Sequence, residues 1–466
     1  MVKITIEVPE EVAEQLKELE AKRAELKSGT GPVDWMPLAA SAEAVGSGLV
    51  ADIKRRLLRD VDIDAKRILV DGKPHVKVGR HQATYYAKEA ALTMTRSVYR
   101  PCGERNAKTV DVVSLRLGVV GGWLPEAAKA AAFLVQQGTS REAAATARAL
   151  GVLPFSRSSF ERVGHKVGAH YSVVRDDVED ALIRGYEVPA EARSVSVSVD
   201  RVAVPFEEPR PRGVGRPRRG AAKRPVDRVW HMAYVGTVTL HDVQGDAIHT
   251  LRYARMPSDG ADDLVSNMAT DVQVLLGKRD LSVMLLSDGA PELIDVLDRH
   301  VDRDAIGREP RRLIDFWHVV EKLGAAARVI HGEKGAGPVI DRWRALLLNS
   351  ATAVPRILGE LERSGYRHVR VGDERPVHAA ITYLTNNQFR MDFASARAAG
   401  LPIGSGNVEA TCKSLIGQRL VRTGSRWKEE TAQHVADLRA LALSERFDDA
   451  VDLTLRPLRH QVQRAA

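Results

Sequence analysis

The sequence Ser-Val-Ser-Val-Ser-Val-Asp, at residues 194–200, alternates strictly between polar and apolar side chains and ends in a carboxylate. Period-two alternation of β-branched with small polar residues is typical of a β-strand, because successive side chains point to opposite faces of a sheet. Its parity places Asp200 on the face of the three serines, opposite Val195, Val197 and Val199. The stretch therefore predicts a strand with an acid at its end.

Further strand patterns follow this stretch along the chain. Residues 229–240 and 247–253 are rich in Val, Tyr, Trp and Thr, and residues 281–287 form an apolar run that ends in Asp288. Pro291 then occupies the first-turn position that proline favours in helices, and residues 312–318 are a further strand candidate that leads into a helix. Three adjacent strands followed by a helical crossover predict an α/β (α+β overall) protein with a ribonuclease H-like mixed sheet.

Length and composition limit the class of protein. The 466 residues predict roughly three structural units. The chain has 69 Lys and Arg against 61 Asp and Glu, a net charge of +8 that is compatible with a polyanionic partner. Two cysteines, no signal-peptide pattern and no apolar run of membrane-spanning length predict a soluble, cytoplasmic protein with no membrane partner.

The first 190 residues are expected to form two regions. Residues 1–115 predict an α+β region whose function the sequence does not indicate, and residues 116–190 predict a helical region. Capping boxes at Thr139/Glu142 and Ser158/Glu161 mark two of three predicted short helices. Such a triplet is typical of a helix-turn-helix DNA reader, and it also occurs in ordinary all-α packing.

Residues 207–228 differ in composition from the rest of the chain. Eight of the 19 residues from 210 to 228 are basic, and prolines and glycines are interleaved with them, so we expect a mobile loop. Gly215-Arg216-Pro217 is similar to the centre of an AT-hook. The two interpretations are a solvated linker and a loop that follows DNA phosphates. The second assigns DNA contacts to Arg210, Arg212, Arg216, Arg218 and Arg219.

Three carboxylates form the candidate catalytic group. Asp200 and Asp288 follow two strands, and Glu409 lies in the first turn of a helix that is predicted to begin after the glycine-rich turn 401–406. Three carboxylates are a suitable ligand set for Mg²⁺ ions that activate a water or hydroxyl in phosphoryl transfer. Taken alone, each acid is weak evidence, because an Asp after a strand most often forms a turn or caps a helix and the helix dipole favours a Glu in the first turn.

Several stretches carry a resemblance to a known family. Residues 287–290, 313–323, 404–413 (Gly-Ser-Gly-Asn-Val-Glu-Ala-Thr-Cys-Lys) and 417–427 resemble the catalytic domain of bacterial insertion-sequence transposases of the ISKra type, and the resemblance extends over residues 120–445. It implies a DDE transposase in which Asp200, Asp288 and Glu409 bind two Mg²⁺ ions, with Mn²⁺ as a possible substitute. It also places Asp315 and His318 near the site, although packing roles at the strand end explain these two residues equally well.

The resemblance has implications for partners and for the order of domains. It implies binding of double-stranded DNA, both element ends and target, by a nucleoid-associated homo-oligomer, with metal-dependent cleavage and strand transfer. The catalytic domain would comprise residues 191–300, a strand and helical insertion at 301–399, and the final catalytic helix and C-terminal helices at 400–466. Two alternatives remain: a ribonuclease H-like nuclease without joining activity and a non-catalytic DNA-binding regulator. Four basic residues are candidate phosphate ligands or part of a solvated helix face: Lys413, Arg419, Arg422 and Arg426.

Overall fold

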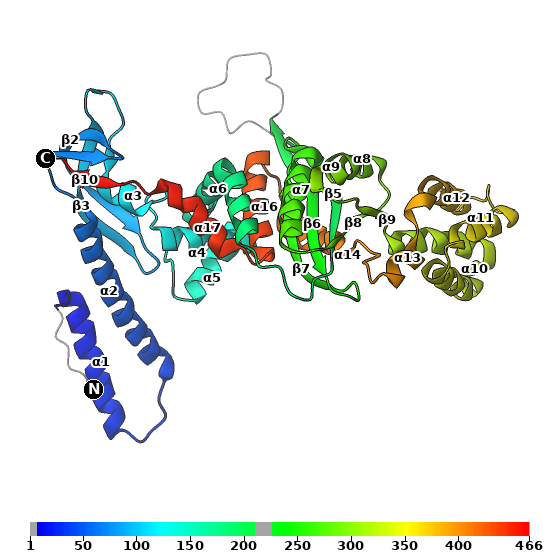
Figure 1. Ribbon diagram of the computed structural model, residues 1–466. Helices are drawn as coiled ribbons and strands as arrows, with labels where there is room; N and C mark the ends of the chain where they lie inside the picture. Colours follow the sequence, from blue (N-terminus) through cyan, green and yellow to red (C-terminus); the bar gives the residue numbers. More distant parts are fainter. Residues whose placement is uncertain (1–6, 210–225, 466) are drawn as a thin grey trace, which may run out of the picture. The chain divides into compact units, whose positions relative to one another are not determined.

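The computed structural model describes residues 7–209 and 226–465 of the chain (Figure 1). The chain divides into two compact units, one formed by residues up to 174 together with 448–466 and the other by residues 175–447. None of the described helices is both long and apolar enough to cross a membrane. Residues 448–466 thus belong to the first unit, whereas the sequence analysis predicted that all of residues 400–466 belong to the catalytic domain.

The first unit contains an antiparallel sheet of order β10-β1-β2-β3-β4 and several helices. Its core includes Ile68, Tyr99 and Val112, all fully buried. The elements are α1 (Glu10–Ser28), α2 (Trp35–Val61), β1 (Arg67–Val70), β2 (Lys73–Tyr86), β3 (Ala91–Pro101), β4 (Val110–Asp111), α3 (Val112–Leu117), α4 (Pro125–Gln137), α5 (Ser140–Ala149), the first part of α6 (Arg157–Gly185), α17 (Phe447–Leu455), η3 (Arg456–Leu458) and β10 (Val462–Arg464).

The three helices predicted for the helical region are present, with two differences. The capping box of Thr139 and Glu142 opens α5 as predicted. Ser158 does not cap a helix, because α6 already begins at Arg157. The third helix is also not short: α6 continues to Gly185 through a distorted residue, Val174, at which the backbone leaves helical geometry.

The second unit is built on a five-stranded sheet of order β7-β6-β5-β8-β9. Strands β5, β6 and β7 pair antiparallel, and β5-β8 and β8-β9 pair parallel. The elements are β5 (Ser194–Pro209), β6 (Val226–His241), β7 (Ala247–Arg255), α7 (Gly260–Lys278), β8 (Ser282–Ser287), α8 (Pro291–His300), α9 (Arg303–Ile306), β9 (Arg311–Ile314), α10 (Phe316–Asn349), α11 (Ala353–Arg363), α12 (Pro376–Asn387), η1 (Gln388–Arg390), α13 (Phe393–Ala398), α14 (Gly406–Thr411), the π-helical segment η2 (Cys412–Gly417), α15 (Gln418–Leu420) and α16 (Glu429–Leu443).

Helices cover both faces of this sheet, and strand parity decides what each face buries. Val195, Val197 and Val199 pack against α7 and α8, and the serines of the same strand lie on the other face. The serines are also buried, because β5 is a central strand with helices on both sides. On the serine face, α14, η2 and α16 pack against Val204 and Val235. The predicted parity of the Ser194–Asp200 stretch is thus confirmed, whereas the predicted end of the strand at Asp200 is wrong, because β5 continues to Pro209.

Two predicted boundaries in this unit are wrong. The loop predicted at 207–228 begins too early, because β5 and β6 continue to pair through Glu207 with Arg228 and Pro209 with Val226. The strand predicted at 312–318 ends at Ile314. Helix α10 begins at Phe316, because the Asp315 side chain accepts hydrogen bonds from the amides of Trp317 and His318 and so caps the helix. The five arginines predicted to contact DNA from residues 210–219 lie outside the described residues.

Candidate functional site

Asp200 lies on β5 at the level at which its parallel neighbour β8 ends and is followed by Asp288. The β5-β8 register pairs Ser198 with Leu286, so two residues further along both strands the chain reaches Asp200 and Asp288. Adjacent strands are about 4.8 Å apart, which brings the main chains of the two acids close together. Both side chains are half-buried. The sheet therefore brings the main chains of two of the three predicted acids together, at the C-terminal end of β8.

The Asp288 carboxylate also has a local structural contact. Its Oδ1 accepts a hydrogen bond from the amide of Ala290 at 2.9 Å, and its main-chain carbonyl accepts one from the Tyr383 hydroxyl at 2.7 Å. Pro291 then begins α8 as predicted. Asp288 thus forms the turn that an Asp-Gly dipeptide favours. Its other carboxylate oxygen, Oδ2, accepts no hydrogen bond from the described residues.

Glu409 reaches the site from the helix that covers the serine face. It lies in the first turn of α14, three residues before the buried Cys412. The Cys412 thiol donates to Asp200 Oδ2 at an Sγ–O distance of 3.5 Å. Burial raises the pKa of the Cys412 thiol well above its ordinary value, and the charges of Asp200 and Glu409 raise it further. Cys412 is therefore a neutral donor within the electrostatic reach of both carboxylates.

His318 and Asp315 support this helix from α10. His318 Nε2 is 3.1 Å from Glu409 Oε1, and both side chains are partly exposed. Asp315 is buried; its Oδ1 accepts from the amides of Trp317 and His318 at 2.7 and 2.9 Å, and its Oδ2 accepts from the Ser405 hydroxyl at 2.8 Å and from the Ser405 amide. Asp315 thus joins the beginning of α10 to the turn that precedes Glu409.

The carboxylate oxygens of the three acids are suitable ligands for a hard cation, but the three side chains do not converge on one point. Carboxylate oxygens are the ligands that Mg²⁺ prefers. Within residues 7–209 and 226–465, however, no three His, Cys, Asp or Glu side chains lie close enough together to hold a metal ion. The strand register brings Asp200 beside the main chain of Asp288, and the Cys412 thiol contacts Asp200 and feels the charge of Glu409. The Glu409 carboxylate itself contacts His318.

The predicted basic residues after Glu409 differ in exposure. Lys413 and Arg426 are exposed, and Arg422 is half-buried. Arg419 is 4% exposed, and its guanidinium lies 5.0 Å from the centre of the Trp427 ring, so it packs inside the unit rather than on its surface. Trp427 is half-buried and donates through Nε1 to the carbonyl of Leu420 at 3.0 Å, so it acts as a packing anchor.

The structure also shows three exposed aromatic rings that the sequence interpretation did not include. Trp230, Trp317 and Phe389 are 51, 55 and 70% exposed, and each has an arginine guanidinium over its ring, at 4.8, 5.2 and 4.4 Å from the centre. Rings with adjacent cations can stack bases and contact phosphates. The spacing Arg228-x-Trp230 places both residues on one strand face and could have been recognised from the sequence, whereas the arginine over Trp317 is distant along the chain.

Comparison with known proteins does not assign the chain to a family. No family model matches the chain, and no curated protein matches it at a significant level. The functional interpretation therefore depends on the arrangement of residues described above.

Proposed function

We propose that this protein is a DNA transposase of the DDE type, which cleaves DNA at the ends of its element and joins those ends to target DNA. One observation carries the proposal: Asp288 directly follows β8 at the level that Asp200 occupies on the parallel neighbour β5, and Glu409 approaches the same face on a covering helix. Three separate parts of the sequence thus supply carboxylates to one region. Metal-dependent phosphoryl transfer uses such a set of acids.

The sheet order supports a ribonuclease H-like fold. Three antiparallel strands are followed by two parallel strands, with helices on both faces. The first acid lies on the central strand β5, the second follows its parallel neighbour β8, and α10 to α13 form the helical insertion before the helix of Glu409. This order agrees with the resemblance seen in the sequence to insertion-sequence transposases.

The residues of the chain have separate tasks in this mechanism. Asp200, Asp288 and Glu409 are the residues that would hold Mg²⁺ through carboxylate oxygens. When bound, the metal would supply activation of the attacking water or 3′-hydroxyl and neutralise charge on the leaving oxygen. Cys412 orients Asp200 by donating its thiol proton, and the exposed Lys413 binds the DNA backbone next to Glu409. No covalent protein–DNA intermediate is required.

Recognition of the element ends is assigned to the first unit. Helices α5 and α6 are separated by the turn at residues 150–156, in which Gly151 has a positive φ of 67°. A short helix, a glycine turn and a following helix form the arrangement with which helix-turn-helix proteins enter the major groove. End recognition and chemistry are thereby assigned to different compact units of the chain.

The decisive experiment is a strand-transfer assay with oligonucleotides copied from the DNA that flanks the gene. We expect Mg²⁺-dependent cleavage and joining by the wild type, and loss of both in Asp200→Asn with DNA binding retained. Asp246→Asn is the matched control, because this exposed acid lies in the turn between β6 and β7 and should leave activity unchanged. Chemistry that persists in Asp200→Asn would refute the site assignment.

The same assay separates the two alternatives. Cleavage without joining identifies a ribonuclease H-like nuclease, and binding without either reaction identifies a DNA-binding regulator. The position of Asp200 favours chemistry over the regulator, because this acid lies inside β5, where it neither closes a turn nor caps a helix.

A further inference from the structure

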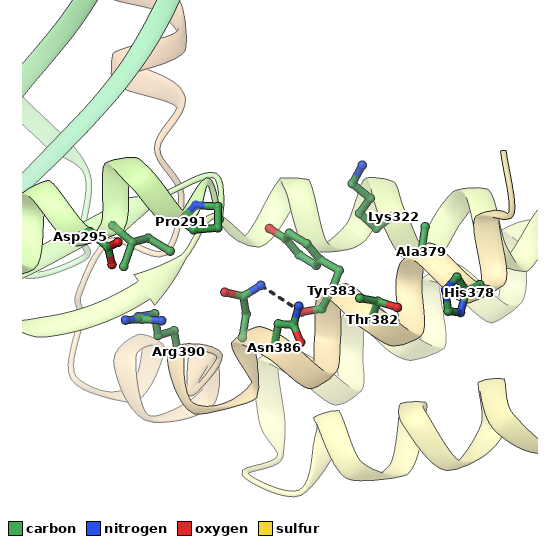
Figure 2. A pocket seen from close by; sticks show the side chains of 12 residues that line it. Pro291, Asp295, Lys322, His378, Ala379, Thr382, Tyr383, Asn386 and Arg390 are labelled. Atoms are coloured by element: carbon green, nitrogen blue, oxygen red, sulfur yellow. Dashed lines mark hydrogen bonds between the residues drawn. The ribbon is translucent and has the colours of Figure 1, made fainter. Parts of the chain in front are cut away.

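A second polar site lies directly beside Asp288, in a pocket of about 530 Å³. It is enclosed by the beginning of α8, by α10 and by α12, and Figure 2 shows the Tyr383 side chain at its centre, between Pro291 and Lys322. The volume is within the range of about 300 to 1,000 Å³ that is common for small-ligand sites. Neither the three catalytic acids nor the helix-turn-helix accounts for this pocket.

The pocket shares a wall with the catalytic strand end. The Tyr383 hydroxyl donates to the Asp288 carbonyl at 2.7 Å. A Cβ atom added at Gly289 would lie 2.9 Å from Cε2 of the Tyr383 ring, so this ring packs against the main chain next to Asp288. A molecule in the pocket therefore lies one residue from a proposed metal ligand.

The polar groups of the pocket are available for a ligand. Lys322 and Asn386 are exposed and make no side-chain hydrogen bond or ion pair among the described residues. Arg390 pairs with Asp298 at 3.1 Å through one terminal nitrogen, whereas its Nε is buried and has no hydrogen-bond partner in the described part of the chain. Because this Nε has no accessible surface, it faces protein rather than the pocket, and Lys322 and Asn386 are the groups available to a ligand.

The distribution of charge in the pocket indicates how a ligand would be oriented. In Figure 2, Lys322 and Asp295 lie on opposite sides of Tyr383. The lysine end favours a phosphate group and the aspartate end opposes one. The amide of Asn386 offers both a donor and an acceptor, the pair that matches the edge of a nucleobase.

We propose that this pocket binds a single unpaired nucleotide of the DNA held at the catalytic site. Lys322 contacts its phosphate, Asn386 hydrogen-bonds the base edge, and the Tyr383 ring lies against the base. A base in a duplex is covered by its neighbours, so a nucleotide enters such a pocket only after it leaves the stack. This proposal rests on the proposed function, since it requires DNA to be bound at Asp288. It further requires that one nucleotide of this DNA leaves the base stack.

The test compares two duplexes in binding to the full chain at one fixed salt concentration. One is a blunt 30-base-pair duplex, and the other is the same duplex with one unpaired 2-aminopurine, whose fluorescence reports its environment. We expect the second to bind about tenfold more tightly. The double variant Lys322→Ala/Asn386→Ala should remove this preference and retain the affinity for the blunt duplex. Lys334→Ala, an exposed position on α10 outside the pocket, is the control.

The outcomes distinguish the pocket from the proposed function. Equal binding of both duplexes by the wild type, or a preference that survives in the double variant, overturns the pocket proposal and leaves the transposase proposal intact. Failure to bind either duplex overturns both. A preference that disappears in the double variant, with 2-aminopurine fluorescence returning toward the value of free DNA, supports the unpaired-nucleotide site.

Discussion

Replacement of Asp315 by alanine should destabilise the second unit more than loss of an ordinary helix cap. The carboxylate accepts from two amides at the beginning of α10 and from the amide and hydroxyl of Ser405, and both Asp315 and Ser405 are buried, at 1 and 3% exposure. Loss of a helix cap costs about 1 kcal/mol. Each buried donor left without a partner costs about 1 to 3 kcal/mol. Because such terms are not additive, the expected total is about 3 to 5 kcal/mol.

The matched control for this substitution is Asp392→Ala. Asp392 caps α13 by accepting one hydrogen bond from the Ser395 amide at 3.2 Å, and it is exposed, so the expected loss is about 1 kcal/mol. Urea unfolding followed by circular dichroism measures both variants, and amide hydrogen exchange of residues 401–411 shows whether the turn before Glu409 opens. If Asp315→Ala costs no more than Asp392→Ala, the idea that Asp315 joins α10 to this turn is wrong.

Three further predictions concern other parts of the chain. Because Cys412 is buried with a raised pKa, thiol reagents should modify only the other cysteine in the native protein, as peptide mass mapping will show. Burial raises the pKa of Asp271 from an ordinary 3.8 to about 7, so wild-type stability relative to Asp271→Asn should fall as pH rises from about 4 to about 7, which pH-dependent urea unfolding will test. In urea unfolding, Gly289→Ala should lower the free energy of unfolding by about 1 to 3 kcal/mol more than Gly365→Ala. Both glycines have a positive φ, and only Gly289 faces the Tyr383 ring.

The sheet of the second unit could be predicted because each strand has a local signal. The alternation at 194–200 fixed both the strand and the face of Asp200, and the apolar run at 281–287 with Pro291 fixed the next strand and its helix. Strand length was harder to predict. Residues 201–209 continue β5 without regular alternation, because their pairing with β6 is what keeps them extended.

Other features depend on contacts between distant residues and have no local signal. The return of residues 448–466 to the first unit depends on pairing of β10 with β1 and on ion pairs from Lys129 to Asp448 and Asp452. The contact of His318 with Glu409 joins residues 91 positions apart, and the pocket beside Asp288 is formed by three helices. A single sequence identifies such side chains only as polar residues on helices.

Local hydrogen bonding explains Asp288 and Asp315 but not Asp200. Asp288 closes a turn and Asp315 caps a helix, tasks that acids perform at the ends of elements without any chemistry. Asp200 lies within the sixteen-residue strand β5, where it accepts from the amide of Arg201 and the thiol of Cys412, contacts that close no turn and cap no helix. No task in a turn or a helix cap therefore accounts for this acid, so the functional interpretation depends on Asp200 more than on either of the other acids.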